Sequence, residues 1–406
     1  MIEPLCDTRD LRPLKQPVIL VTNAFPPENL VGALRPGRFA KYLPQFGYEP
    51  YVVTSSPQPE PAANVLVVPF RYTLTERLLS RTIFPYDERY TWVRPAVEVA
   101  ATIVKQHGAR LVLSTSPSVS THLVARHLQR AHGLKWVADF RDPLVGNFSR
   151  VKFWGQRVDG ILEKVFAHSA DLLILNTEAL VEKWRSRYPG IEERLTWLPN
   201  GFDPEDRCHP LPIPPRRHKV WIHAGSLYSN RYPERLIRAV DHLHSRQSLP
   251  ELRLRFIGMV QDVSLMEQQA FRNLEAGGVL DCTWSHLPKA EARREMEEAD
   301  GGIVFDHYHE AGNVQIPAKV YDCICIGRPI LAFTSRSAPL DRVLEQCGIG
   351  NVRIYEDDQP AEIERKVVQF AGLPNDTQRA SEYFQQRFNA AEQTRALAAL
   401  FDSLIG

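Results

Sequence analysis

Residues 313–332 have the sequence NVQIPAKVYDCICIGRPILA, which predicts a polar loop, a short helix opened by Pro317, a stop at Gly327 and then a buried strand. The start of such a helix presents free backbone N–H groups and the positive end of the helix dipole, which both favour an anion. Lys319 lies in the first turn, where a cation is unfavourable unless a negative group is nearby. A bound phosphate would remove this conflict, so the stretch predicts an anion site beside a buried strand.

The rest of the chain repeats this alternation of apolar runs and amphipathic stretches, which predicts an α/β protein with parallel sheets. The strand-like runs are residues 18–22, 51–54, 65–68, 111–114, 136–139, 172–176, 195–198, 220–224, 252–257, 279–282, 302–305 and 330–333.

The domain organisation is predicted from two features. Residues 208–219 (CHPLPIPPRRHK) contain four prolines in twelve residues, which excludes a helix or a central strand and indicates a linker. The tail is predicted to be helical and carries an apolar stripe that needs a partner surface, made of Leu397, Leu400, Phe401 and Leu404. We therefore expect two Rossmann-like domains facing a cleft, residues 1–207 with 380–406 and residues 220–379.

Composition excludes several classes of protein. The 406 residues are 44% hydrophobic and 24% charged with a net charge of +1, so nothing indicates a nucleic-acid partner. No apolar run is long enough to span a bilayer, and the six scattered cysteines have neither disulfide nor zinc spacing. We expect a cytoplasmic protein with at most peripheral association at the inner face of a membrane.

Five sequence blocks carry a family resemblance. They are ILVTNAFPP (19–27), WVADFRDP (136–143), DLLILNT (171–177) with LPNGFD (198–203), GSLYSNRYP (225–233), and residues 313–332. In this order the chain resembles glycosyltransferases of the GT-B fold, in particular the retaining family 4 enzymes. The resemblance implies transfer from a nucleotide-sugar donor, bound mainly by the second domain, to an acceptor hydroxyl bound mainly by the first. The acceptor would be a sugar, a lipid-linked molecule or a small metabolite, and neither a cofactor nor a metal is expected.

Donor-binding residues are predicted in the second domain. Gly225 and Ser226 follow a strand, so their backbone can approach a phosphate closely, although a simple tight turn is the alternative. Arg231 falls near a position where relatives carry a diphosphate-binding basic residue, whereas Ser226 stands where many carry a second one. Lys319 is expected to supply that second charge unless it is only a solvated lysine. Asp322 is expected to accept hydrogen bonds from the nucleotide ribose.

One family residue has no match. Many relatives carry a glutamate eight positions before Asp322, where this chain has Val314. Glu310 is the nearest candidate to contact the donor sugar, with an exposed loop acid as the alternative. Asn313 in the same loop is also expected to bind the donor.

Catalytic residues are predicted after the strand at 136–139. Asp139, Arg141 and Asp142 lie at the edge where parallel sheets bind ligands. Arg141 falls where many relatives carry a histidine, and because arginine cannot act as a base at neutral pH, it is expected to bind substrate charge. Asp142 or Asp139 is then the better proton acceptor. The alternative is an Asp–Arg ion pair that only fixes the loop.

An acceptor-side loop is predicted between Asn23 and Arg35. Gly32 would permit close approach to a ligand, and Arg35 would reach the diphosphate or the acceptor. Other functions stay open on this sequence: an inverting transferase with Asp142 as base, a nucleotide-sugar epimerase, or a non-catalytic binding protein in which Arg141 and the missing glutamate mark lost chemistry.

Overall fold

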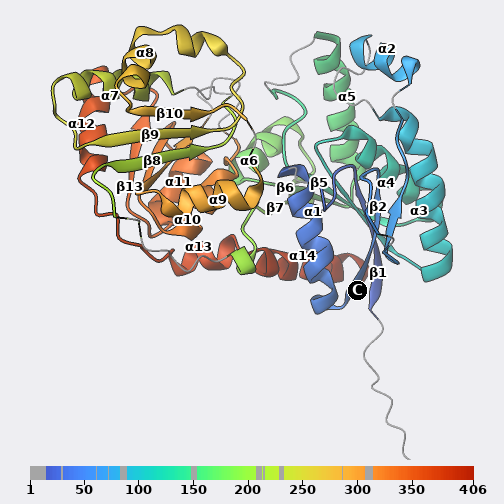
Figure 1. The fold of residues 1–406 in the computed structure, drawn as a ribbon. Coiled ribbons are helices and arrows are strands. Elements are labelled where there is room, and N and C mark those ends of the chain that lie inside the picture. Colours follow the sequence, from blue (N-terminus) through green and yellow to red (C-terminus); the bar gives the residue numbers. More distant parts are fainter. Residues whose placement is uncertain are drawn as a thin grey trace, which may run out of the picture.

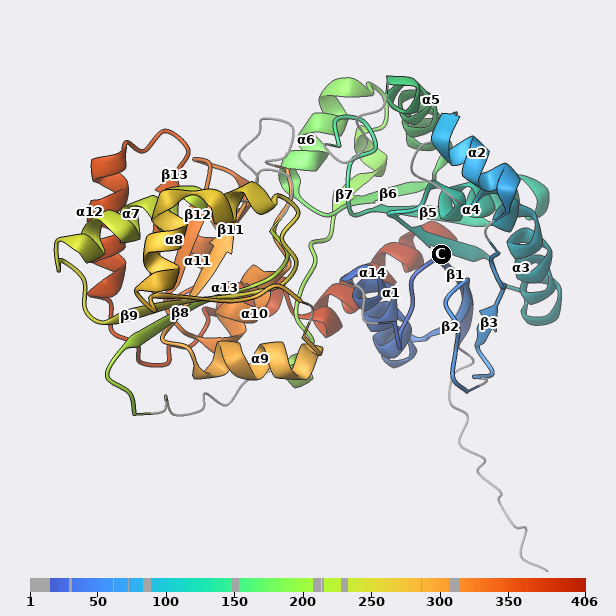
Figure 2. The ribbon, with the colours of Figure 1, turned by 45° about the horizontal axis from the view of Figure 1, so that its top comes forward.

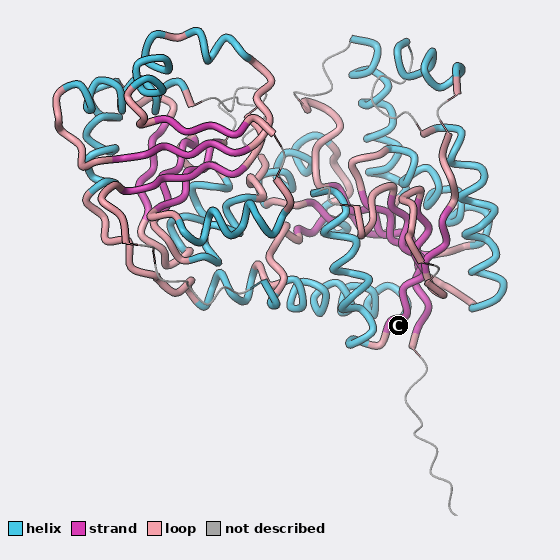
Figure 3. Tube along the Cα trace, viewed as in Figure 1, coloured by secondary structure: helices cyan, strands magenta, loops and turns pink. Residues whose placement is uncertain are grey.

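The protein folds into two parallel β-sheets, each with helices on both faces (Figures 1 and 3). The computed structural model describes residues 15–28, 31–60, 62–71, 73–82, 89–147, 153–206, 213, 215–227, 233–285, 287–306 and 314–406. We call the parts built on the first and second sheet the N-terminal half and the C-terminal half.

The first sheet has the order β3-β2-β1-β4-β5-β6-β7 among the described strands, and its neighbouring strands are parallel. Val18 and Leu20 of the central strand contribute to one hydrophobic core, whereas Ile19 and Val21 contribute to the other. A run of consecutive apolar residues, as at 17–21, is typical of a parallel strand covered on both faces. The strands are β1 (Gln16–Thr22), β2 (Tyr48–Thr54), β3 (Val65–Val67), β4 (Leu111–Thr115), β5 (Lys135–Phe140), β6 (Leu172–Leu175) and β7 (Leu195–Trp197).

The helices of the N-terminal half divide between the two faces of this sheet. One core includes residues of α3, α4, α5 and α6, and the other includes residues of α1 and of the C-terminal helix. The helices are α1 (Val31–Tyr42), α2 (Leu74–Thr82), α3 (Val93–His107), α4 (Val119–His132), α5 (Phe153–Ser169) and α6 (Glu178–Arg187).

The second sheet has the order β10-β9-β8-β11-β12-β13 and is also parallel. Its strands are β8 (Lys219–Ala224), β9 (Leu252–Ile257), β10 (Leu280–Thr283), β11 (Gly301–Phe305), β12 (Ile330–Thr334) and β13 (Asn351–Tyr355). Its helices are α7 (Glu234–Ser245), α8 (Gln269–Ala276), α9 (Lys289–Glu298), α10 (Lys319–Ile326), α11 (Pro339–Gln346) and α12 (Pro360–Ala371). The helix, stop and strand predicted within residues 313–332 are α10, Gly327 in the left-handed conformation (φ +77°) and β12.

The chain returns to the N-terminal half through α13 (Glu382–Arg387) and α14 (Ala390–Ile405), seen along the lower side of the molecule (Figure 1). Leu397 and Phe401 are fully buried against the first sheet, and Leu400 and Leu404 pack on the same core, as the apolar stripe predicted. The hydroxyl of Tyr48 donates to Asp402 over 2.6 Å and fixes the end of the helix.

The two segments that connect the halves are joined to each other. The backbone N–H of Phe202 donates to Phe388 over 2.9 Å, and that of Ala390 donates to Phe202 over 3.0 Å. A side chain on Gly201 would place its Cβ 2.1 Å from the carbonyl oxygen of Phe388, so glycine is required for this close approach. The two connecting segments are therefore paired where they cross between the halves. Residues 208–212 and 214 of the predicted linker lie outside the described residues.

The strands expected from sequence are confirmed, with differences at their ends and one omission, β13. The tail predicted as continuous helix is interrupted between α13 and α14, where the crossover pairing uses the backbone of Phe388 and Ala390. Within the described part of the chain, no helix is both long and apolar enough to cross a membrane.

Candidate active site

The carboxyl edge of the first sheet carries polar side chains that are buried or, for Asp142, partly buried. Asn23 follows β1, Arg141 and Asp142 follow β5, and Asn176 and Thr177 follow β6. Because these strands are parallel and lie close together in the sheet, their carboxyl ends meet at one edge. The predicted catalytic and acceptor-side residues are thereby brought together.

Arg35 and Asp139 form a buried, bidentate ion pair at this edge. Arg35 Nε and Nη2 donate to the two carboxylate oxygens of Asp139 over 2.9 and 2.8 Å, and Nη1 donates to the carbonyl oxygen of Pro199 over 2.7 Å. Thr115 adds a fourth hydrogen bond, to Asp139 Oδ2 over 2.7 Å. Both charged side chains are buried, with Asp139 at 0% exposure.

This geometry differs from what we expected of both residues. Arg35 was expected to reach a ligand, but it joins α1 to the ends of β5 and β7. Asp139 was a candidate proton acceptor, but its carboxylate already accepts hydrogen bonds from Arg35 and Thr115 and is closed to solvent. An Asp–Arg pair that fixes the loop was the alternative, and the structure forms one with Arg35 as the partner.

Arg141 is a buried cation at this edge that keeps unused hydrogen-bond donors. It is 6% exposed, its backbone N–H donates to Ser116 Oγ over 2.8 Å, and its Nη1 donates to the carbonyl oxygen of Gly32 over 2.6 Å. Nε and Nη2 have no hydrogen-bond partner among the described residues. Burial lowers the pKa of this guanidinium, and the Asp139 and Asp142 carboxylates oppose that shift. A buried guanidinium with unused donors is typical of a site completed by an anionic ligand.

The segment predicted as an acceptor-side loop lies over Arg141, but its last residues, including Gly32 and Arg35, belong to helix α1, which begins at Val31 and not after Arg35. Gly32 contributes the carbonyl that Arg141 contacts, and a Cβ on Gly32 would lie 3.6 Å from Nη2 of this arginine. The amide nitrogen of Asn23 donates to Ser120 over 2.9 Å. The side-chain oxygens of Asn23 and Asn176 are buried and have no partner among the described residues. Three unsatisfied groups therefore lie at one sheet edge.

The two halves contact each other at this edge. Gln315 donates its side-chain N–H to Asp142, and Thr177 donates its hydroxyl to the carbonyl oxygen of Val314. Gln315 and Val314 belong to the segment between β11 and α10, at the carboxyl edge of the second sheet. The carboxyl edges of the two sheets thus face each other, with Asp142 at the contact.

The second sheet contributes closely packed backbone. Gly225 follows β8, and its N–H donates to the carbonyl oxygen of Ile257 over 2.8 Å. Gly258 follows β9 with φ +134°, and a Cβ there would lie 2.4 Å from the carbonyl oxygen of Gly225. Only glycine satisfies both constraints. Ser226 continues this turn, and a Cβ on Gly225 would contact Lys319 Cγ at 3.7 Å, so the turn lies next to α10.

Lys319 lies in the first turn of α10, as predicted, although the helix begins at Lys319 itself and not at Pro317; α10 has no side-chain cap. Its Nζ lies 3.4 Å from Asp322 Oδ2, and the two side chains are 38% and 28% exposed. The pair partly offsets the unfavourable position of the lysine, and both groups stay accessible to a ligand. Arg231, Glu310 and Asn313 lie outside the described residues.

Comparison with known proteins identifies the architecture. Residues 37–206 match the model of Glycosyltransferase Family 4. A glycosyltransferase from Rickettsia africae superposes with a TM-score of 0.65 at 10% identity, covering 96% of this chain and 99% of that one. Sucrose-phosphate synthase from Thermosynechococcus elongatus superposes with a TM-score of 0.63 at 14% identity, covering 96% of this chain and 99% of that one. The chain has the fold of a GT-B glycosyltransferase. Anabaena HepE in complex with UDP-glucose is a further match. It superposes with a TM-score of 0.57 at 15% identity, covering 95% of this chain and 99% of that one. No curated protein matches in sequence.

The GT-B resemblance found in the sequence is thus confirmed, but several residues of the site were missed. Gln315, Asn176 and Thr177 lie inside the sequence blocks that carried the resemblance, and a polar residue directly after a strand is the signal that could have found the last two. Gln315 has no such signal, because its partner Asp142 is distant in sequence and meets it only when the two sheets are placed.

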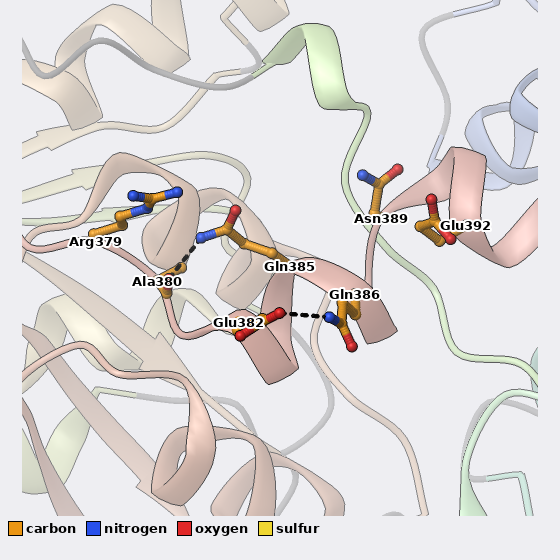
Figure 4. Close-up of a pocket in the computed structure, with 7 residues that line it drawn as sticks. All are labelled: Arg379, Ala380, Glu382, Gln385, Gln386, Asn389 and Glu392. Atoms are coloured by element: carbon orange, nitrogen blue, oxygen red, sulfur yellow. Dashed lines mark hydrogen bonds between the residues drawn. The ribbon is translucent and has the colours of Figure 1, made fainter.

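A separate hollow lies outside the GT-B sheet edges. It has a volume of about 580 Å³ and runs along α13 and the start of α14 (Figure 4). It is lined by Arg379, Ala380, Glu382, Gln385, Gln386, Asn389 and Glu392. None of the predicted site residues lines it, and Gln385 and Gln386 are hydrogen-bonded within the same segment. Among the described residues, no group of three or more His, Cys, Asp or Glu side chains is placed to hold a metal ion.

Proposed function

We propose that the protein transfers a sugar from a nucleotide-sugar donor to an acceptor hydroxyl, with the donor held mainly by the C-terminal half. The observation that carries the proposal is the contact between Gln315 and Asp142. It brings Arg141, with two unused buried donors, to the segment that leads into Lys319 and α10. The match to the family 4 model and the similarity to HepE, which was solved with UDP-glucose, support a donor of this class.

The donor diphosphate is proposed to lie between the turn at Gly225–Ser226 and the start of α10. Backbone N–H groups, the positive end of α10 and Lys319 would offset the charge that develops on the leaving group. Asp322, one turn into α10, is proposed to accept hydrogen bonds from the ribose. Arg231, Glu310 and Asn313 stay candidates for donor contacts on the basis of the resemblance.

Arg141, in the N-terminal half, is proposed to bind a negatively charged group of the substrate. Asp142 is proposed to be the carboxylate that lies nearest to the reacting hydroxyl. Retention is proposed on the resemblance to family 4, with the leaving-group oxygens helping to accept the proton. Metal-independent transfer is proposed because Arg141 and Lys319 offer positive charge to the diphosphate from both halves. No cofactor is included in this proposal.

The test is incubation of the protein with UDP-, ADP-, GDP- and dTDP-sugars, with and without EDTA, in which water takes the place of the acceptor and receives the sugar. Nucleoside diphosphate release is then measured. We expect release from one nucleotide class that EDTA does not abolish. The anomeric configuration of the product, measured by NMR, distinguishes retention from an inverting reaction with Asp142 as base. Release that requires added divalent metal would contradict the metal-independent mechanism.

A second candidate is a nucleotide-sugar-binding protein without turnover. Val314 favours it, because it replaces the family glutamate and is buried, at 8% exposure, with its carbonyl engaged by Thr177. No carboxylate is present at that position. Calorimetric binding of a nucleoside diphosphate without turnover of any donor in the panel would support this candidate over the transferase.

A further inference from the structure

Two helices of the N-terminal half expose apolar and basic side chains together. On α2, Leu74 and Leu78 are one turn apart and are 83% and 63% exposed. On α5, Ile161 is 64% exposed and lies between Arg157 and Lys164, which are exposed on the same side of the helix. Arg71 and Arg77 are exposed beside the two leucines.

The acidic residues of both helices are turned inward. Glu76, the one acid of α2, is 1% exposed and accepts the backbone N–H of Thr91 over 3.3 Å. Asp159 and Glu163, the two acids of α5, are 2% and 0% exposed, and Glu163 accepts the backbone N–H of Leu144 over 3.0 Å. Among the described side chains of the two helices, the carboxylates are therefore buried, whereas the exposed faces carry cations and aliphatic groups.

The two helices lie at the active-site edge of the first sheet. α2 follows β3 and α5 follows β5, so both leave the carboxyl ends of parallel strands. Figures 1 and 2 show α2 beside the N-terminal part of α5 from two directions. Arg141 and Asp142 lie in the segment between β5 and α5. A partner that bound to the exposed faces of these two helices would therefore lie next to the candidate active site.

We propose that this docking surface, made of Leu74, Leu78 and Ile161 with Arg71, Arg77, Arg157 and Lys164, binds an anionic lipid bilayer. Aliphatic side chains flanked by cations are typical of helices that lie in a membrane interface, where the apolar groups enter the acyl boundary and the cations meet anionic headgroups. A bilayer needs no shape complementarity, which suits apolar groups on two separate helices. The proposal does not depend on transferase activity.

The test is flotation of the full-length protein with vesicles of phosphatidylcholine alone and with vesicles that also contain phosphatidylglycerol. We expect binding to the anionic vesicles that weakens with salt. Leu74→Gln/Leu78→Gln should lower the partition coefficient by roughly tenfold or more, because two apolar groups no longer enter the bilayer. Arg71→Gln/Arg77→Gln should lower it by roughly fivefold per arginine. Val368→Gln on α12, a residue with 43% exposure in the C-terminal half, is the matched control and should bind like the wild type.

Three results would overturn the proposal: no binding to anionic vesicles at low salt, unchanged binding of the leucine variant, or an equal loss in the Val368→Gln control. Salt-sensitive binding that is the same with and without the two leucines would indicate only electrostatic attraction between surface cations and the anionic lipids. Thermal unfolding of each variant checks that it is folded. The leucine variant should bind nucleoside diphosphate with the same affinity as the wild type. If the wild type does not bind nucleoside diphosphate at all, the proposed transferase function is rejected, but the proposal of membrane binding is not affected.

Discussion

The two facing sheet edges are built from different groups. The edge of the first sheet consists of buried side chains, in which Arg35 and Asp139 satisfy each other and Arg141 is left with unused donors. The edge of the second sheet consists of backbone at Gly225 and Gly258 and of the partly exposed pair Lys319–Asp322. The first edge is therefore fixed before a ligand arrives, whereas the second offers backbone and solvated charge that a ligand can engage. We therefore predict that stability and ligand binding depend on different charged residues, and this separation can be tested.

The largest effect is expected at the buried pair. Asp139→Ala should lower the free energy of unfolding by about 3–5 kcal/mol, because it leaves Arg35 charged, buried and without its carboxylate partner. Urea denaturation measures the change. The matched control is Asp281→Ala, which removes one of the two carboxylates that pair with Arg255 near the surface and should cost no more than about 1 kcal/mol. Equal denaturation midpoints for the two variants would remove the distinction between a structural and a functional set of charges.

Arg141→Gln should show the opposite pattern, with activity lost and stability kept. We expect the rate of nucleoside diphosphate release from the donor to fall by roughly 10²–10³, as for loss of a donor that stabilises developing charge. The urea midpoint should change little, because the guanidinium makes one side-chain hydrogen bond among the described residues and its burial is costly. Arg94→Gln, at an exposed pair with Glu98, is the control. A stability loss as large as that of Asp139→Ala would show that Arg141 is structural.

Lys319→Ala tests the second edge. It should weaken nucleoside diphosphate affinity, measured by calorimetry, by about 1–3 kcal/mol, as expected for loss of a charged hydrogen bond. Lys105→Ala on the exposed end of α3 should leave the affinity unchanged. An unaltered dissociation constant in Lys319→Ala would contradict the proposal that the start of α10 binds the diphosphate.

The smallest effect concerns pH. His122 is fully buried below the first edge, its Nδ1 is 2.8 Å from Ser114 Oγ, and burial lowers its pKa to about 3. Because the unfolded chain takes up the proton near pH 6.5 and the folded protein does not, stability is lost as pH falls below about 6.5. Between pH 7 and pH 5 this contributes about 1–2 kcal/mol.

His122→Gln should reduce this dependence in urea titrations at the two pH values, whereas His127→Gln, on the exposed face of the same helix, should not. An unchanged difference between pH 7 and pH 5 in the His122 variant would mean that other groups cause the acid sensitivity.

Much of this architecture follows from local pattern. The apolar run at residues 18–21 predicts a buried strand, and the stripe that includes Leu397 and Phe401 predicts a docked helix. Both predictions depend only on which residues must be buried, and the sequence pattern shows this directly. The pairing of Arg35 with Asp139 was not predicted, although both residues were singled out. Their partners depend on which strand ends lie together, and Gln315 meets Asp142 only after both sheets are placed. Charged groups at a sheet edge can therefore be found from sequence, but their division into structural and ligand-binding sets requires the three-dimensional contacts.

The most direct test of donor binding by the second edge is a crystal structure of the protein soaked with nucleoside diphosphates and their sugars. We expect diphosphate oxygens within about 3 Å of Lys319 Nζ and of the backbone at Gly225–Ser226, on the side that faces Arg141. A diphosphate bound instead in the hollow along α13, or none at saturating concentration, would contradict the account.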